Sequence, residues 1–192
     1  MEEDVVPPPF FFISFMYDKE QYLDKGKLYE NKTMEILERF VGGKCKPSTE
    51  KENKRDHIDV HWNYEGNDVT IDVKGPKKFN RWDNDNPSSD VVWIEVQGIT
   101  GKPGWIYGKS TFIAFWLRNG ITFVYTQKFR KLYEMVMINK HVYVGAKPSN
   151  PYELYQRNGR QDILFTMPVA DLEKIQEYTI SFDELRKLNY TI

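Results

Sequence analysis

Two alternating runs decide the fold of this 192-residue chain: His57-Ile58-Asp59-Val60-His61 and Thr70-Ile71-Asp72-Val73-Lys74-Gly75. Apolar and polar residues alternate in both runs, which is the pattern of a β-strand with one buried face. The polar stretch between them, residues 63–68, holds Asn, Gly and Asp residues that favour a tight turn. The sequence therefore predicts a β-hairpin.

The predicted hairpin gathers charged side chains on one face. Side chains two apart on a strand share a face, so Asp72 and Lys74 point the same way. When the hairpin closes, Asp59 lies opposite either Asp72 or Lys74. These two registers differ by two residues, so Asp59 lies on the same face as Asp72 and Lys74 in both. Two carboxylates beside a lysine suit a hard divalent cation, and we expect Asp59 and Asp72 to be its ligands.

A helix is predicted over residues 18–41, ending at Gly42-Gly43, because glycine commonly follows a helix. At 100° per residue its apolar side chains fall in one broad arc, and Glu30 falls inside that arc. A buried acid is costly unless something satisfies it. We expect Glu30 to reach the metal site; the alternative is a rim position or an ion pair with a lysine.

Composition indicates a folded globular protein, with 40% hydrophobic and 15% aromatic residues. The formal net charge of −1 excludes nucleic-acid binding through bulk positive charge, so any such binding needs a local patch. The one cysteine, Cys45, cannot form an internal disulfide and fits a reducing cytosol. No run approaches the roughly 20 apolar residues that span a bilayer, and the acidic start is unlike a secretory signal, so no membrane partner is expected.

The whole chain, residues 1–192, is predicted to form one domain. Residues 1–16 are expected to be an extended N-terminal segment, and residues 168–192 a C-terminal helical segment. Residues 44–56 are expected to be an exposed loop, and 127–138 a helix with apolar residues at helical spacing. The remaining expected strands are 91–97, 112–116, 121–125 and 163–167.

These elements resemble the PD-(D/E)XK nuclease superfamily, the restriction-endonuclease-like fold, over roughly residues 25–125. In that superfamily an early helix carries an acid, a first strand carries Asp, and the next strand carries an acid, one residue and Lys. The matching positions here are Glu30, Asp59, Asp72 and Lys74. The chain also looks like small phage or bacterial nucleases of this superfamily, which often carry a turn like that of residues 104–109. The resemblance implies an α/β fold with a central mixed four- to five-stranded sheet flanked by helices.

The resemblance further implies a metal-dependent nuclease that hydrolyses phosphodiester bonds by metal-activated water, with DNA favoured over RNA. It places the protein in the cytoplasm of a bacterial or phage-infected cell. Glu30, Asp59, Asp72 and the backbone carbonyl of Val73 would bind Mg²⁺ or Mn²⁺, while Lys74 would position water or stabilise the transition state. Because the net charge is near zero, affinity for nucleic acid is expected to be modest, or a homodimer or a partner protein could supply further contacts to the substrate. The candidate substrate-binding residues are Gln97, Lys109, Lys77 and Lys78.

Other interpretations stay open at this point. His57, Asp59 and His61 would share one strand face and could form a transition-metal site. The fold could also serve as a catalytically silent binding or interaction module, or the charged cluster could be structural. Arg157 and Arg160 lie in a polar turn that could contact a nucleic-acid backbone, although a solvated surface is the favoured interpretation.

Overall fold

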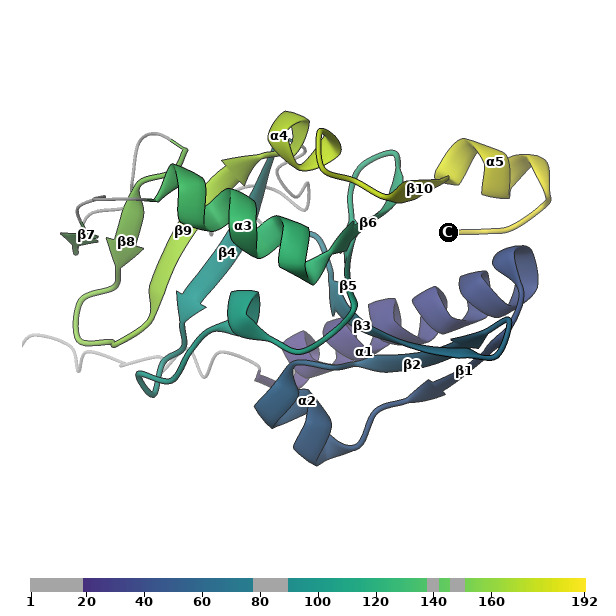
Figure 1. The fold of residues 1–192 in the computed structure, drawn as a ribbon, viewed down its shortest axis with the longest axis horizontal. Coiled ribbons are helices and arrows are strands. Elements are labelled where there is room, and N and C mark those ends of the chain that lie inside the picture. The colour runs from purple at the N-terminus through teal and green to yellow at the C-terminus, as the bar shows by residue number, and fades with distance from the viewer. Residues whose placement is uncertain (1–18, 78–89, 138–141, 146–150) are drawn as a thin grey trace, which may run out of the picture.

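The computed structural model describes residues 19–77, 90–137, 142–145 and 151–192 (Figure 1). Within these residues the chain is mixed α/β, with a six-stranded sheet, a four-stranded sheet and flanking helices. The predicted N-terminal segment, residues 1–16, and the candidate substrate-binding residue Lys78 lie outside the described residues.

The six-stranded sheet has the order β1-β2-β3-β5-β6-β10, and every neighbouring pair is antiparallel except β3 and β5, which are parallel. The expected four to five strands of the central sheet are therefore too few, because β1 and β10 add to its two edges. The bounds are β1 Lys44–Pro47, β2 Val60–Tyr64, β3 Asn67–Lys74, β5 Phe112–Trp116, β6 Gly120–Tyr125 and β10 Tyr178–Ser181.

The predicted β-hairpin is present as β2 and β3, with Val60 opposite Ile71. Its turn is Glu65-Gly66, and both residues have positive φ angles, 50° and 80°, as tight hairpin turns require. The first strand begins at Val60 rather than at residue 57. Asp59 still follows the same register, because its backbone N–H donates to the carbonyl of Ile71.

A second sheet of four strands has the order β4-β9-β8-β7. The strand predicted over residues 91–97 belongs to this sheet, since it pairs antiparallel with the strand that begins at Ile163. An alternating pattern identifies a strand but not its partner, so the sequence could not separate the two sheets. The bounds are β4 Val91–Gln97, β7 Val142–Val144, β8 Leu154–Gln156 and β9 Ile163–Pro168.

The predicted long helix is confirmed as α1 (Lys19–Ile36), which continues into the π-helical turn η1 (Leu37–Val41) and ends at Gly42, φ 104°. The segment predicted as a loop, residues 44–56, is wrong: it contains β1 and a further helix, α2. The predicted helix at 127–138 is α3. The other helical bounds are α2 Glu50–Asp56, η2 Trp105–Tyr107, α3 Thr126–Val136, α4 Val169–Glu173 and α5 Phe182–Lys187.

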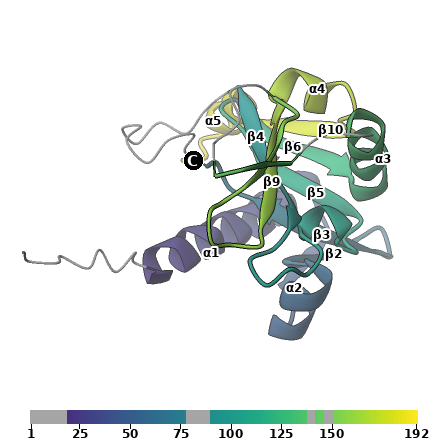
Figure 2. The same cartoon turned by 90° about the vertical axis from the view of Figure 1, so that its left-hand side faces the viewer.

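Two apolar cores lie on opposite faces of the six-stranded sheet. The first packs α1 and α5 against one face and includes Ile36 and Ile71. The second joins the other face to α3 and to the four-stranded sheet, and includes Ile113, Phe129 and Phe165. Figure 2 shows β9 and β4 crossing in front of β5 and β3. The six-stranded sheet is therefore covered on one face by α1 and α5, and on the other face the second core covers β5 and β6.

Candidate metal and phosphate site

Asp59 and Asp72 form a buried pair of carboxyl groups at the paired ends of the hairpin. They are 8% and 2% exposed, respectively. Oδ2 of Asp59 accepts a hydrogen bond of 2.7 Å from the backbone N–H of Val73, and Oδ1 accepts one from the side chain of Asn53. Asp59 is thus held by both β3 and α2. It lies opposite Asp72 rather than Lys74, which is one of the two predicted registers.

Asp72 has one satisfied oxygen and one that lacks a donor. Lys74 Nζ lies 2.5 Å from Oδ1 of Asp72, as expected for two residues on one strand face. Oδ2 is buried and has no hydrogen-bond partner among the described residues. Burial raises the pKa of Asp72 to about 8; the charge of Lys74 opposes this rise, and Asp59 adds to it. Two adjacent buried carboxylates repel each other, and Lys74 balances only one of their two charges, so the pair also needs a proton or a second cation.

The ammonium group of Lys74 is covered by an aromatic ring. Its Nζ lies 4.9 Å from the ring centroid of Trp105, within the range of a cation–π contact. Trp105 belongs to η2, which packs against β4 because Gly104 donates a 2.8 Å hydrogen bond to the carbonyl of Val96. A Cβ atom on Gly104 would lie 2.2 Å from the carbonyl oxygen of Glu95, so only glycine fits there.

Glu30 lies near this pair but has its own partner. Its Oε2 is 2.9 Å from Nζ of Lys27, and its side chain is 17% exposed. Burial raises the pKa of Glu30, and the charges of Lys27, Asp59 and Lys74 also act on it. Glu30 therefore forms the ion pair with a lysine that the alternative interpretation expected, and its binding to a metal stays a prediction.

No group of three or more His, Cys, Asp or Glu side chains is arranged to hold a metal ion in the part of the chain that the structure describes. A divalent cation here would use the two carboxylates of Asp59 and Asp72, with carbonyl and water oxygens completing its shell. Mg²⁺ is commonly bound in this way, through one or two carboxylates and several waters. The buried Oδ2 of Asp72, which lacks a donor, fits such an ion.

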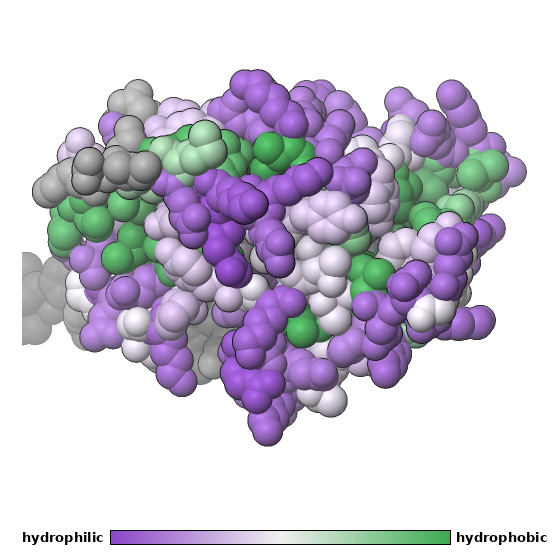
Figure 3. Space-filling view, viewed as in Figure 1, coloured by the Kyte–Doolittle hydropathy of each residue, from purple (hydrophilic) through white to green (hydrophobic). Residues whose placement is uncertain are grey.

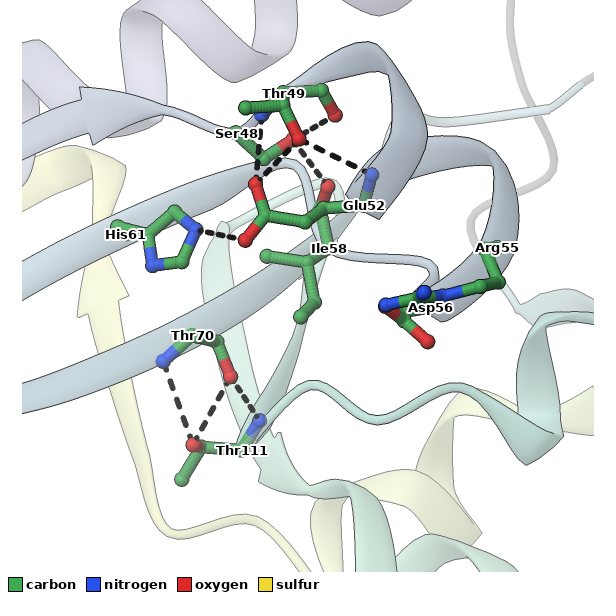
Figure 4. Close-up of polar contacts among 9 residues, drawn as sticks. All are labelled: Ser48, Thr49, Glu52, Arg55, Asp56, Ile58, His61, Thr70 and Thr111. Carbon is green, nitrogen blue, oxygen red and sulfur yellow. Dashed lines mark hydrogen bonds and ion pairs between the residues drawn. The ribbon is translucent and has the colours of Figure 1, made fainter.

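Helix α2 supports the site from below in the view of Figure 1, and its surface there is strongly hydrophilic (Figure 3). It begins with a capping box, in which Thr49 and Glu52 satisfy each other's backbone N–H groups. Figure 4 shows the carboxylate of Glu52 between Thr49 and His61, whose Nε2 is 3.3 Å from Glu52. Figure 4 also shows Thr70 and Thr111 joining β3 to the segment that precedes β5.

The expected strand face of His57, Asp59 and His61 is wrong. His57 ends α2 in a left-handed conformation, φ 52°, so it does not follow the alternation of β2. His61 contacts Glu52 instead. Burial lowers the pKa of His57, and the charge of Lys74 lowers it further, which places His57 at the margin of the site.

The other predicted substrate-binding residues have mixed positions. Lys109 pairs with the buried Asp56 at 2.9 Å, and hydrogen bonds from Arg55 and Lys109 hold the pKa of Asp56 well below its usual range. Gln97 lies on β4 and donates to the carbonyl of Gln161, 2.5 Å away. Burial lowers the pKa of Lys77, and the charge of Lys74 lowers it further, while the charges of Glu95 and Asp72 oppose this.

Three groups that sequence analysis did not assign to the site adjoin it. Asn53 holds Asp59 from α2. Burial raises the pKa of Glu95, on β4, and the charges of Lys77 and Lys74 counteract this rise. The charge of Arg157, from the turn after β8, acts on both Lys77 and Glu95. The Thr-x-x-Glu pattern at residues 49–52 could have revealed α2. No local signal places Glu95 or Arg157 within reach of Lys77.

Comparison with known proteins found no match among protein-family models, curated proteins or solved structures. The likeness to the PD-(D/E)XK superfamily thus remains a resemblance carried by the residues named above. Among the helices of residues 19–77, 90–137, 142–145 and 151–192, none has both the length and the hydrophobicity needed to cross a membrane.

Proposed function

We propose that this protein is a metal-dependent nuclease that hydrolyses phosphodiester bonds, with Asp59, Asp72 and Lys74 at its centre. The observation that carries the proposal is the buried pair of carboxyl groups, in which Oδ2 of Asp72 has no donor among the described residues. A buried polar atom without a partner is costly, so such a site is suited to a ligand that completes it.

Mg²⁺ or Mn²⁺ bound by Asp59 and Asp72 would activate a water molecule and neutralise charge that develops on the phosphate. The chain's own contribution begins with Lys74, whose ammonium group is fixed between Asp72 and the ring of Trp105. A lysine held in this way can stabilise negative charge on the reacting phosphate. Asn53 and the N–H of Val73 keep Asp59 in place. Glu30 would bind the ion through water or tune the charge of the site.

DNA is proposed as the substrate ahead of RNA, on the resemblance alone. A second candidate is a nuclease-fold binding module without catalysis. Two ion pairs favour the binding module, Lys27 with Glu30 and Lys74 with Asp72. In each pair a lysine of the chain already neutralises an acid of the site.

Cleavage of labelled single-stranded and duplex DNA and RNA, with Mg²⁺, Mn²⁺ or EDTA, tests the proposal. We expect metal-dependent cleavage by the wild type and its loss in Asp72→Asn and Lys74→Ala. Asp68→Asn is the matched control, because Asp68 is an exposed acid on the same strand. If the folded wild type cuts none of these substrates with either metal, the nuclease proposal fails and the binding module remains.

A further inference from the structure

Arg157 is held by a buried acid. Asp162 is 0% exposed, and its Oδ2 accepts hydrogen bonds from Nε, at 2.6 Å, and from Nη2 of Arg157. The side chain of Arg157 remains 36% exposed. Its turn is closed by a 3.1 Å hydrogen bond from the N–H of Arg160 to the carbonyl of Arg157. The guanidinium group is thus fixed through one edge, and Nη1 takes no part in the contact with Asp162.

The pairing of β4 with β9 places this arginine beside the candidate site. Gln97 lies opposite Ile163, the residue that follows Asp162, so the buried acid adjoins the end of β4. Glu95, two residues earlier on β4, feels the charges of Lys77, Lys74 and Arg157. The packing of η2 on β4 also brings Trp105 to this strand, and Lys74 lies over the ring of Trp105.

Two cations with exposed surface, Arg157 and Lys77, lie at this junction of the two sheets. Lys77 is exposed over much of its surface, yet desolvation of its ammonium group lowers its pKa, and the charges of Lys74 and Arg157 lower it further. Glu95 is the acid whose charge opposes this most strongly. An exposed cation beside the candidate site can bind a phosphate oxygen through a charge-assisted hydrogen bond.

We propose that Arg157 and Lys77 bind a second phosphate of the nucleic acid, next to the phosphate that is cleaved. This inference rests on the proposed nuclease function and specifies its substrate as a polynucleotide strand that extends from β3 onto the four-stranded sheet. Arginine is suited to this role because its planar group binds phosphate through paired N–H donors. Contacts to phosphate carry no sequence information, so we expect this grip to be the same for all base sequences.

Binding of a fluorescent single-stranded oligodeoxynucleotide, measured by anisotropy in EDTA over a range of KCl concentrations, tests this inference without cleavage. The key variant is Arg157→Gln with Asp162→Asn, which removes the arginine without leaving a buried charge unpaired. We expect about tenfold weaker binding at low salt. The slope of log K against log [KCl] should be shallower by about 0.7, which corresponds to one phosphate contact on a single strand.

Arg160→Gln is the matched control, because Arg160 is an exposed arginine of the same turn. Its salt slope should equal that of the wild type. If the Arg157/Asp162 variant also keeps the wild-type slope and affinity, the second phosphate position does not exist, although Asp72-dependent cleavage would still support the nuclease. If the wild type neither binds nor cuts nucleic acid, the nuclease proposal fails and this inference fails with it.

Two further variants keep the test decisive if the double variant does not fold. Arg157→Lys retains the charge but loses the planar donor group, so affinity should fall several-fold with little change in slope. Lys77→Gln should also lower the slope. If the two side chains hold the same phosphate, the effects of Arg157→Lys and Lys77→Gln on affinity should not be additive. Unchanged affinity in both single variants would overturn the inference.

Discussion

Replacing Asp72 with Asn should stabilise the metal-free protein increasingly as pH rises. The ordinary pKa of the carboxyl is 3.8, and burial raises it to about 8 in the folded chain. Between these values the folded protein keeps a proton that the unfolded chain has lost. The contribution of Asp72 to stability is therefore fully present below about pH 4 and is lost as pH rises towards about 8. Asparagine has nearly the same shape and no charge to desolvate, so the variant lacks this loss.

The size of the effect follows from the number of protons involved. One proton bound only in the folded state lowers the free energy of unfolding by about 1.4 kcal/mol for each pH unit. Between about pH 5 and pH 7, the Asp72→Asn variant should therefore gain about 3 kcal/mol relative to the wild type. Other titrating groups, including His57 and Glu30, are common to both proteins, so their effects largely cancel in the difference.

Urea unfolding followed by tryptophan fluorescence in EDTA, at several pH values, measures this difference. Asp68→Asn serves as the control for exchanging an exposed carboxyl for an amide on the same strand. Added Mg²⁺ should raise the stability of the wild type at neutral pH through mass action and should leave the stability of Asp72→Asn unchanged. A difference between the two proteins that stays constant from about pH 5 to pH 7 would show that Asp72 is ionised in the fold, and the reasoning would be refuted.

Three other predictions follow from separate contacts. Lys74→Gln should reduce nuclease activity at least about 100-fold, in the range of losing one transition-state donor, whereas Lys46→Gln, an exposed lysine on β1, should leave the rate unchanged in the same assay. Thr49→Ala removes the capping-box acceptor of α2 and should lower the free energy of unfolding by about 1 kcal/mol in urea titrations. Gly104→Ala should destabilise the protein by several kcal/mol, because the new Cβ would overlap a carbonyl group of β4. In Gly26→Ala, on α1, the new Cβ meets nothing within 4 Å, so this variant should be more stable by about 1 kcal/mol. Thermal unfolding compares the two variants, and equal melting temperatures would contradict the packing of η2 on β4.

The sequence contained enough information to bring Asp59, Asp72 and Lys74 together, because their arrangement depends on local physics. Alternation fixes which side chains of β3 share a face, and the turn at Glu65-Gly66 fixes the register of the hairpin. The end of the long helix was equally local, since a glycine with positive φ terminates it.

Other parts of the structure depend on contacts between distant segments and could not be predicted in this way. Strand β4 pairs with β9, about seventy residues further along the chain, and nothing in either strand names its partner. The sequence therefore favours a solvated surface for Arg157, whereas its guanidinium group is paired with the fully buried Asp162. Helix α2 was missed for a different reason: its sequence is almost entirely charged or polar, so it has no apolar stripe to reveal a helix.

The unpredicted second sheet also explains why the predicted carboxyl pair has unusual properties. Asp72 lies beside Ile113 in the register of β3 with β5, and Ile113 faces the core shared with the four-stranded sheet. The same core carries Trp105, which stacks on Phe129 and covers Lys74. On the six-stranded sheet alone this face would be open to water, and a solvated aspartate would keep an ordinary pKa. The hairpin thus supplies the charged groups, while the second sheet removes water from them and adds Arg157 at the margin, so that the proposed chemistry requires both sheets.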